Sequence, residues 1–206
     1  MHSASNPNNY EAVVRAGFTS TPDDHALLVA ALGGAPRDRV LALRGLTRRG
    51  EVTDDLWCQV LNDTDADVRR EALTQLAQHH VAAVVSDVAV SLLTDDDPLV
   101  VEAAAFALAE SLYVPAVPVL LEVAAHHEDA RCRESAIAAL GAIGDDRARA
   151  VIIGALDDKP PVRRRAIVAL ANFEGPDIDA ALERASEDRD WQVRAAVHQL
   201  GRDEDD

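Results

Sequence analysis

Apolar residues recur along the chain with the period of an amphipathic α-helix, and the pattern itself recurs in tandem. An alanine followed four residues later by a leucine recurs in register at six places, with steps of 30, 32, 32, 30 and 30 residues. This spacing places both residues on one face of a helix. Because neighbouring columns repeat in the same register, the pattern indicates a repeat protein. The pairs are Ala42/Leu46, Ala72/Leu76, Ala104/Leu108, Ala136/Leu140, Ala166/Leu170 and Ala196/Leu200.

An apolar residue stands four positions before most of these alanines, and an arginine follows it. Val101 replaces the arginine in one copy, and in the last copy the pair slips by one residue, to Val193-Arg194. Cys132 takes the place of a valine in the apolar column, so we expect a buried and inert thiol there. The apolar column comprises Val68, Val100, Cys132 and Val162, and the arginine column comprises Arg39, Arg69, Arg133 and Arg163.

A short acidic turn precedes each of these helices. Its last aspartate, Asp65, Asp97 or Asp129, occupies the position of a helix N-cap, where a carboxylate accepts bonds from unpaired backbone N–H groups. Pro98 and Pro160 then fall in the first helical turn, where a missing N–H group costs nothing. The turns therefore predict where the second helix of each repeat begins.

A further apolar-periodic segment fits between each of these helices and the next turn. The sequence thus predicts an all-α fold of about six antiparallel helical pairs. We expect one repeat domain over residues 20–201, a polar lead over residues 1–19 that can form part of a helical cap, and an acidic tail over residues 202–206. Glycines near the predicted helix ends suit chain reversal; they are Gly141, Gly144 and Gly175.

The motif D-x-x-V-R-x-x-A-x-x-A-L-G, present as DARCRESAIAALG and DKPPVRRRAIVALA, resembles the HEAT repeat, especially its short variety first noted in phycobilisome lyases. The resemblance implies a right-handed α-solenoid whose second helices line a concave face. It also implies that the arginine column bonds turn aspartates and carbonyls and so ties one repeat to the next. The first copy departs at Asp38, as expected of a terminal repeat. The inter-repeat residues implied are Arg39, Arg69, Arg133, Arg163, Asp65, Asp97 and Asp129.

The net charge of −16 is built from few residue types, because 24 of the 36 acidic residues are aspartates and Lys159 is the single lysine. Coding bias and adaptation to a salty cytoplasm both account for this composition. The charge argues against nonspecific nucleic-acid binding, which needs clustered positive charge. The sequence shows no secretory signal and no apolar stretch of membrane-spanning length. Two cysteines, Cys58 and Cys132, fit a reducing compartment, so we expect a cytoplasmic protein.

Histidine pairs raise the hypothesis of a metal site. The HEAT-like hydroxylases that bind two irons use His-Glu pairs within second helices, and only His127-Glu128 matches that dipeptide here, in a turn. His79 and His80 end a second helix, whereas His126 ends a first helix, so the pairs are expected at opposite rims of the layer. We therefore predict no metal and no cofactor, and no catalytic set of residues can be chosen from the many capping carboxylates.

The second helices present a mixed set of side chains on their predicted concave face. Mixed charge and few aromatic residues argue against the HEAT-like enzymes that excise alkylated DNA bases. Trp57 is predicted to be in the core, whereas Trp191 is left undecided between core and binding anchor. The partner-binding residues predicted are Arg70, Thr74, Glu102, Phe106, Glu134, Arg164 and Arg165.

The sequence therefore favours a non-enzymatic scaffold or adaptor that binds another protein, with no role in nucleic-acid or membrane binding. One alternative is an enzyme, or an accessory subunit, of the HEAT-like lyase type that acts on a protein-bound prosthetic group. Another is a structural role in which the ends of the solenoid mediate self-assembly. Fold alone does not decide between these functions.

Overall fold

The structure, a computed structural model, describes residues 7–19 and 21–203, and all regular elements in those ranges are helical. The all-α prediction is confirmed, and first and second helices alternate along the chain as the repeat pattern indicates. The residues group into two compact units, Met1–Val88 and Ala89–Asp206.

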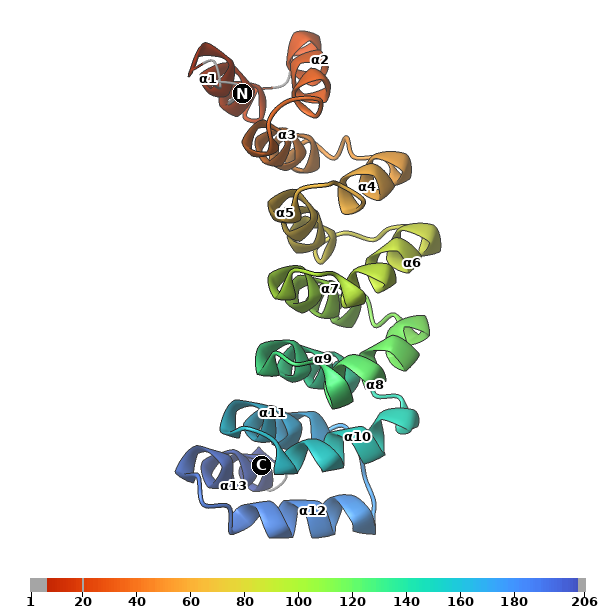
Figure 1. Cartoon of the computed structure of the whole chain (residues 1–206), viewed down its shortest axis with the longest axis vertical. Helices are drawn as coiled ribbons and strands as arrows, with labels where there is room; N and C mark the ends of the chain where they lie inside the picture. The colour runs from red at the N-terminus through yellow and green to blue at the C-terminus, as the bar shows by residue number, and fades with distance from the viewer. Residues whose placement is uncertain (1–6, 20, 204–206) are drawn as a thin grey trace. The chain divides into compact units, whose positions relative to one another are not determined.

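Unit 1 is built around α3 and α5, which are second helices of successive repeats and pack against each other. The first helices α2 and α4 pack against α3 and α5 respectively, and α1 packs on both α2 and α3 (Figure 1). Helix α1 lies in the segment expected to be a polar lead, of which residues 1–6 are outside the described residues. The helices are α1 (Pro7–Ala16), α2 (Pro22–Ala31), α3 (Pro36–Arg48), α4 (Asp54–Leu61) and α5 (Ala66–Leu76), and α6 (Ala83–Ser91) crosses the boundary of the unit.

Unit 2 continues the same pattern, with α7, α9, α11 and α13 following one another along one side of the unit (Figure 1). The first helices α8, α10 and α12 pack against α9, α11 and α13. Of the acidic tail, residues 204–206 lie outside the described residues. The α-helices are α7 (Pro98–Glu110), α8 (Val117–His126), α9 (Ala130–Ile143), α10 (Arg149–Gly154), α11 (Pro160–Leu170), α12 (Pro176–Ser186) and α13 (Trp191–Asp203). Short 3-10 segments are η1 (Leu92–Thr94), η2 (Val114–Ala116), η3 (Asp146–Ala148) and η4 (Ala155–Asp157).

The repeating apolar columns form the core of both units. Val68, Val100, Cys132 and Val162 are all fully buried, and the column alanines and leucines that follow them are buried as well. Burial of a valine or leucine side chain stabilises the fold by roughly 1.5–3 kcal/mol. In the last repeat Ala196 and Leu200 are only half-buried, because no further repeat covers them in the described chain.

Two glycines of α9 have different structural roles. Gly144 ends the helix in the left-handed conformation, with φ 69°, and its N–H donates to the carbonyl oxygen of Leu140. Gly141 lies within the helix, and a Cβ at this position would approach the Cβ of Ala169 on α11 to 2.6 Å. The expected chain reversal at Gly141 is therefore wrong, because this glycine serves the close approach of two second helices.

Candidate partner-binding surface

The arginine column of unit 2 joins successive repeats by bidentate ion pairs. The Nε and Nη2 atoms of Arg133 donate to Asp158 at 2.6 and 2.7 Å, and Nη1 donates to the carbonyl oxygen of His127 at 2.6 Å. Arg163 repeats this geometry with Asp188 at 2.9 and 2.8 Å and with the carbonyl oxygen of Asp158 at 2.8 Å. Each arginine thus holds the turn before its own helix and the turn of the next repeat.

In unit 1 the same column contacts the turns that contain Gly34 and Asp63. Arg39 donates to Asp63 at 2.8 Å and to the carbonyl oxygen of Gly34 at 2.7 Å, but its buried Nε has no hydrogen-bond partner. Arg69 donates to the carbonyl oxygen of Asp63 at 2.7 Å. Asp63 therefore receives one arginine on its carboxylate and a second on its carbonyl group. Two successive repeats are tied at this one turn.

The three aspartates implied as inter-repeat residues lie at the N-termini of their own helices. Asp65 accepts from the N–H groups of Asp67 and Val68, Asp97 from that of Leu99, and Asp129 from that of Arg131. These three carboxylates therefore act as N-caps of their own helices. Carboxylates that do pair with the arginine column include Asp63, Asp158 and Asp188, which lie earlier in their turns.

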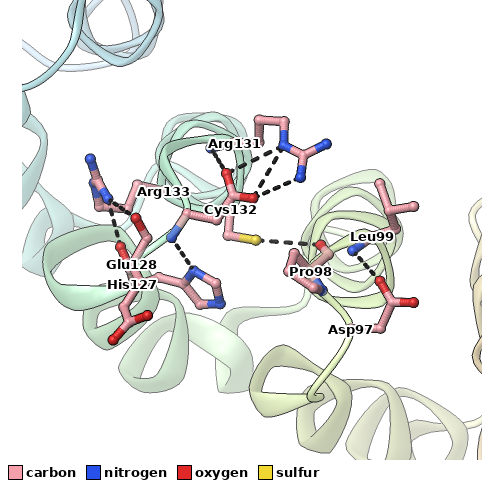
Figure 2. Close-up of polar contacts among 9 residues, drawn as sticks. Asp97, Pro98, Leu99, His127, Glu128, Arg131, Cys132 and Arg133 are labelled. Carbon is pink, nitrogen blue, oxygen red and sulfur yellow. Dashed lines mark hydrogen bonds and ion pairs between the residues drawn. The ribbon is translucent and has the colours of Figure 1, made fainter.

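The inter-repeat ion pair is missing between α7 and α9. Val101 takes the arginine position and is fully buried, and His127 takes the position of the acceptor aspartate. The Nδ1 atom of His127 accepts the N–H of Asp129 at 3.1 Å, as the carboxylates of Asp63 and Asp188 accept the corresponding N–H groups in their own turns (Figure 2). Both halves of the ion pair are thus replaced together, whereas the turn keeps its internal bond.

Cys132 lies at this same junction. Its Sγ atom donates to the carbonyl oxygen of Pro98 on α7 at 3.3 Å (Figure 2). Burial, reinforced by the charges of Asp129 and Glu102, raises the pKa of the Cys132 thiol to about 11. The thiol is therefore protonated near neutral pH and is a poor nucleophile. Both Cys132 and the half-buried Cys58 are free cysteines.

In unit 1 the predicted binding residues lie on α5. Arg70 pairs with Asp67 on the same helix at 2.7 Å, and the hydroxyl of Thr74 donates to the carbonyl oxygen of Arg70 at 2.9 Å. Next to them Arg44 of α3 forms a bidentate pair with Glu71 at 2.7 and 2.6 Å. Burial alone would raise the pKa of Glu71, but bonds from Arg44 and Gln75 lower it overall. This pair was missed from the sequence, because the column pattern gives no sign of it.

In unit 2 the remaining predicted residues lie on adjacent second helices. Phe106 of α7 is 55% exposed, and Glu102 lies half-buried one turn before it on the same helix. Glu134 of α9 and Arg165 of α11 form an ion pair at 3.4 Å. We call the outward-facing side chains of α7, α9, α11 and α13 the second-helix surface. It includes Glu102, Phe106, Glu134, Arg164, Arg165, Val168, Trp191, Gln192, Ala195 and Gln199.

Trp191, which the sequence leaves undecided, is an exposed residue at the start of α13. Its side chain is 67% exposed, whereas Trp57 is 3% exposed and belongs to the core as predicted. Trp191 lines a hollow of about 340 Å³ between α11 and α13, together with Arg164 and Arg165. Arg164 bridges the two helices, because its Nη1 donates to Oε1 of Gln192 at 2.9 Å. The polar neighbours of Trp191 in the sequence are the one signal that could have indicated its exposure.

The histidine pairs lie in two different units. His79 is exposed, lies 5.9 Å from the ring of Trp57, and contacts the carbonyl oxygen of Gln75 at 2.7 Å through Nδ1. His126 is exposed on α8, where it lies 3.9 Å from Glu122. Within residues 7–19 and 21–203, no three His, Cys, Asp or Glu side chains are grouped so that they could hold a metal ion. In the same ranges, no helix combines the length and apolar character needed to cross a membrane.

Stacked helical pairs joined by arginine–aspartate contacts define a helical repeat protein. A family model described as HEAT repeats matches residues 55–141 and 117–201. The chain therefore belongs to the HEAT repeat family, as the sequence motif indicated. No curated protein matches the chain.

Solved structures show the same fold class. An engineered protein is 22% identical, with a TM-score of 0.59 over 94% of this chain and 95% of its own. The YIBA protein of E. coli is 16% identical, with a TM-score of 0.62 over 96% of this chain and 75% of its own. A designed armadillo repeat protein, solved in complex with the peptide (KR)4, is 15% identical, with a TM-score of 0.58 over 91% of this chain and 96% of its own. At these identities the likeness concerns the fold alone.

Proposed function

We propose that the protein is a cytoplasmic, non-enzymatic adaptor that binds another protein through its second-helix surface. The observation that carries the proposal is the exposure of large apolar side chains on that surface: Phe106 at 55%, Val168 at 49% and Trp191 at 67%. The core columns of α7 and α11 are buried without Phe106 and Val168, and Trp191 is largely exposed at the start of α13, so these side chains are free to contact a partner. Exposed aromatic residues among charges of both signs are typical of protein-binding surfaces.

The fold class supports this mode of binding. Successive second helices present adjacent rows of side chains on a surface whose residues are fixed by a close-packed core. One designed armadillo repeat protein of similar fold was solved in complex with the peptide (KR)4. We carry over only that a stacked helical repeat of this kind can bind a peptide. The preference for a basic peptide does not follow, because the present surface carries Arg164 and Arg165.

Affinity capture from the native source, followed by cross-link mapping, tests the proposal. We expect the cross-links to fall on the second-helix surface. We also expect the Phe106→Ala variant to capture about tenfold less partner than the unaltered chain. Val84→Ala on the first helix α6 is a matched control, because Val84 is 56% exposed and Phe106 is 55% exposed. Equal loss in both variants would contradict the assignment of the face. Stoichiometric iron or a retained chromophore in the purified protein would instead support the lyase-type alternative.

A further inference from the structure

The three consecutive arginines of α11 have different surroundings. Arg163 is 4% exposed and is held by Asp188, so its charge is used within the fold. Arg164 and Arg165 line the hollow of about 340 Å³ between α11 and α13. The other residues that line it are Val168, Trp191, Gln192, Ala195, Ala196 and Gln199. The hollow therefore combines two guanidinium groups with an exposed indole ring.

The charge of this hollow is opposite to that of the chain as a whole. No lining residue is acidic, although the chain has a net charge of −16. Arg164 donates to the neutral amide of Gln192, so this contact leaves its positive charge uncompensated. Arg165 faces Glu134 at 3.4 Å, with side-chain exposures of 43% and 24%, which is a loose and partly hydrated pair. A guanidinium group has five N–H donors, so both arginines keep donors for a ligand.

The apolar part of the hollow is fixed beside these donors. Trp191 and Val168 are 67% and 49% exposed, and Ala195 is exposed between Trp191 and Gln199 along α13. Tryptophan and arginine are the residue types that most often contribute the binding energy of protein interfaces. A ligand that covers the indole ring would also exclude water from the guanidinium groups and so strengthen their bonds to an acceptor.

We propose that this hollow binds an acidic segment of a partner protein, in which carboxylates flank a bulky apolar side chain. The carboxylates pair with Arg164 and Arg165, and the apolar side chain packs on Trp191. This inference rests on the proposed adaptor function and specifies the partner for one part of the second-helix surface. Glu134 partly offsets the charge of Arg165, and the carboxylate of Asp190 accepts the N–H of Gln192 at the start of α13, so Arg164 is expected to supply most of the attraction. Acidic residues more than about 8 Å away are screened at physiological ionic strength.

A labelled peptide tests the chemistry directly. The probe is a fluorescein-labelled peptide in which glutamates flank a leucine and a phenylalanine, titrated with the full chain and followed by fluorescence anisotropy. We expect saturable binding that weakens with added salt, and an affinity about tenfold lower for Arg164→Glu and for Trp191→Ala. Arg184→Glu on α12 makes the same change of charge outside the hollow and is expected to alter the affinity by less than about twofold.

Three results would overturn the inference. The first is the absence of saturable binding by the unaltered chain. The second is equal or tighter binding of a peptide with lysines in place of the glutamates. The third is equal or tighter binding of a single-stranded oligonucleotide of the same charge, which would assign the hollow to phosphate.

The failure of this inference can be distinguished from that of the adaptor function. If Trp191→Ala keeps its captured native partner while Phe106→Ala loses it, the acidic-segment site is wrong and the adaptor function stands. If both variants keep the partner, the second-helix surface is not the binding face.

Discussion

The ion pair between Arg163 and Asp188 allows the energetic value of the arginine column to be measured. The two side chains are 5% and 15% exposed and are joined by two bonds, of 2.9 and 2.8 Å. Arg163→Met keeps an apolar stem of similar length but leaves Asp188 without its cation. Removal of one partner of a buried pair costs about 3–5 kcal/mol of unfolding free energy. Because Asp188 is partly exposed, we expect a loss of about 3 kcal/mol, at the lower end of this range.

A double-mutant cycle separates the pair from its surroundings. Arg163→Met, Asp188→Asn and the double variant are unfolded with urea, and we expect a coupling free energy of about 2 kcal/mol. The matched control is Arg70–Asp67, an ion pair of 2.7 Å whose side chains are 43% and 71% exposed. Its coupling should stay below about 0.5 kcal/mol, because exposed pairs are solvated and screened. Equal couplings at the two sites would refute the claim that burial makes the arginine column stabilising.

The same cycle has a defined pH dependence. Bonds from Arg163, which outweigh the effect of burial, lower the pKa of Asp188 below its ordinary value of 3.8. A carboxylate with a lowered pKa in the folded state contributes stability above its unfolded pKa, and this stability is lost as the pH falls through the folded pKa. The difference in free energy of unfolding between the unaltered chain and Asp188→Asn should therefore be constant from neutral pH to about pH 5. It should shrink below about pH 4, because Asp188 then becomes protonated. A difference that persists at about pH 2 would contradict this assignment.

Three further changes test other parts of the structure. Val101→Arg combined with His127→Asp supplies both halves of the missing ion pair. We expect the free energy of unfolding of the double variant, measured with urea, to be about 2 kcal/mol higher than the sum of the two single changes predicts. Additive changes would count against this geometry. Leu112 adopts a φ of 48°, a left-handed conformation that glycine adopts without strain. Leu112→Gly should therefore raise the free energy of unfolding by up to about 1 kcal/mol. A clear decrease in this free energy would show that the contacts of the leucine side chain outweigh the backbone strain. In the native chain at about pH 8, Cys58 should react with a thiol reagent, whereas Cys132 should react only after unfolding. Mass spectrometry counts the labelled cysteines. Rapid labelling of both cysteines in the native chain would contradict the burial of Cys132.

Much of the fold could be predicted from the sequence because the same physical requirement recurs in every repeat. Each helical pair must bury one apolar face against its neighbours, so Val100, Ala104 and Leu108 are constrained together, and their register is visible in the printed sequence. Aspartates and prolines mark the helix starts for an equally local reason, since they act on the first turn of their own helix.

Contacts between repeats were harder to predict because they depend on side-chain reach rather than on local pattern. The motif implied Asp65, Asp97 and Asp129 as inter-repeat residues, yet the bidentate acceptors of unit 2 are Asp158 and Asp188. Both kinds of aspartate stand in the same short turns, and only the fold shows which carboxylate faces its own helix. The hollow around Trp191 was missed for a related reason, because its walls come from two helices.

The offset of the arginine column has a consequence for how such a chain can be lengthened or shortened. Because Arg133 reaches forward to Asp158, one helical pair holds the donor of one ion pair and the acceptor of another. Excision of one complete pair would bring the arginine of the preceding pair to the acceptor turn of the following pair, so the ion pair can form again only where both flanking copies keep their member of it. At Val101 and His127 both members are replaced, so excision of a pair on either side of this junction would leave one arginine or one aspartate of the flanking copies without its partner.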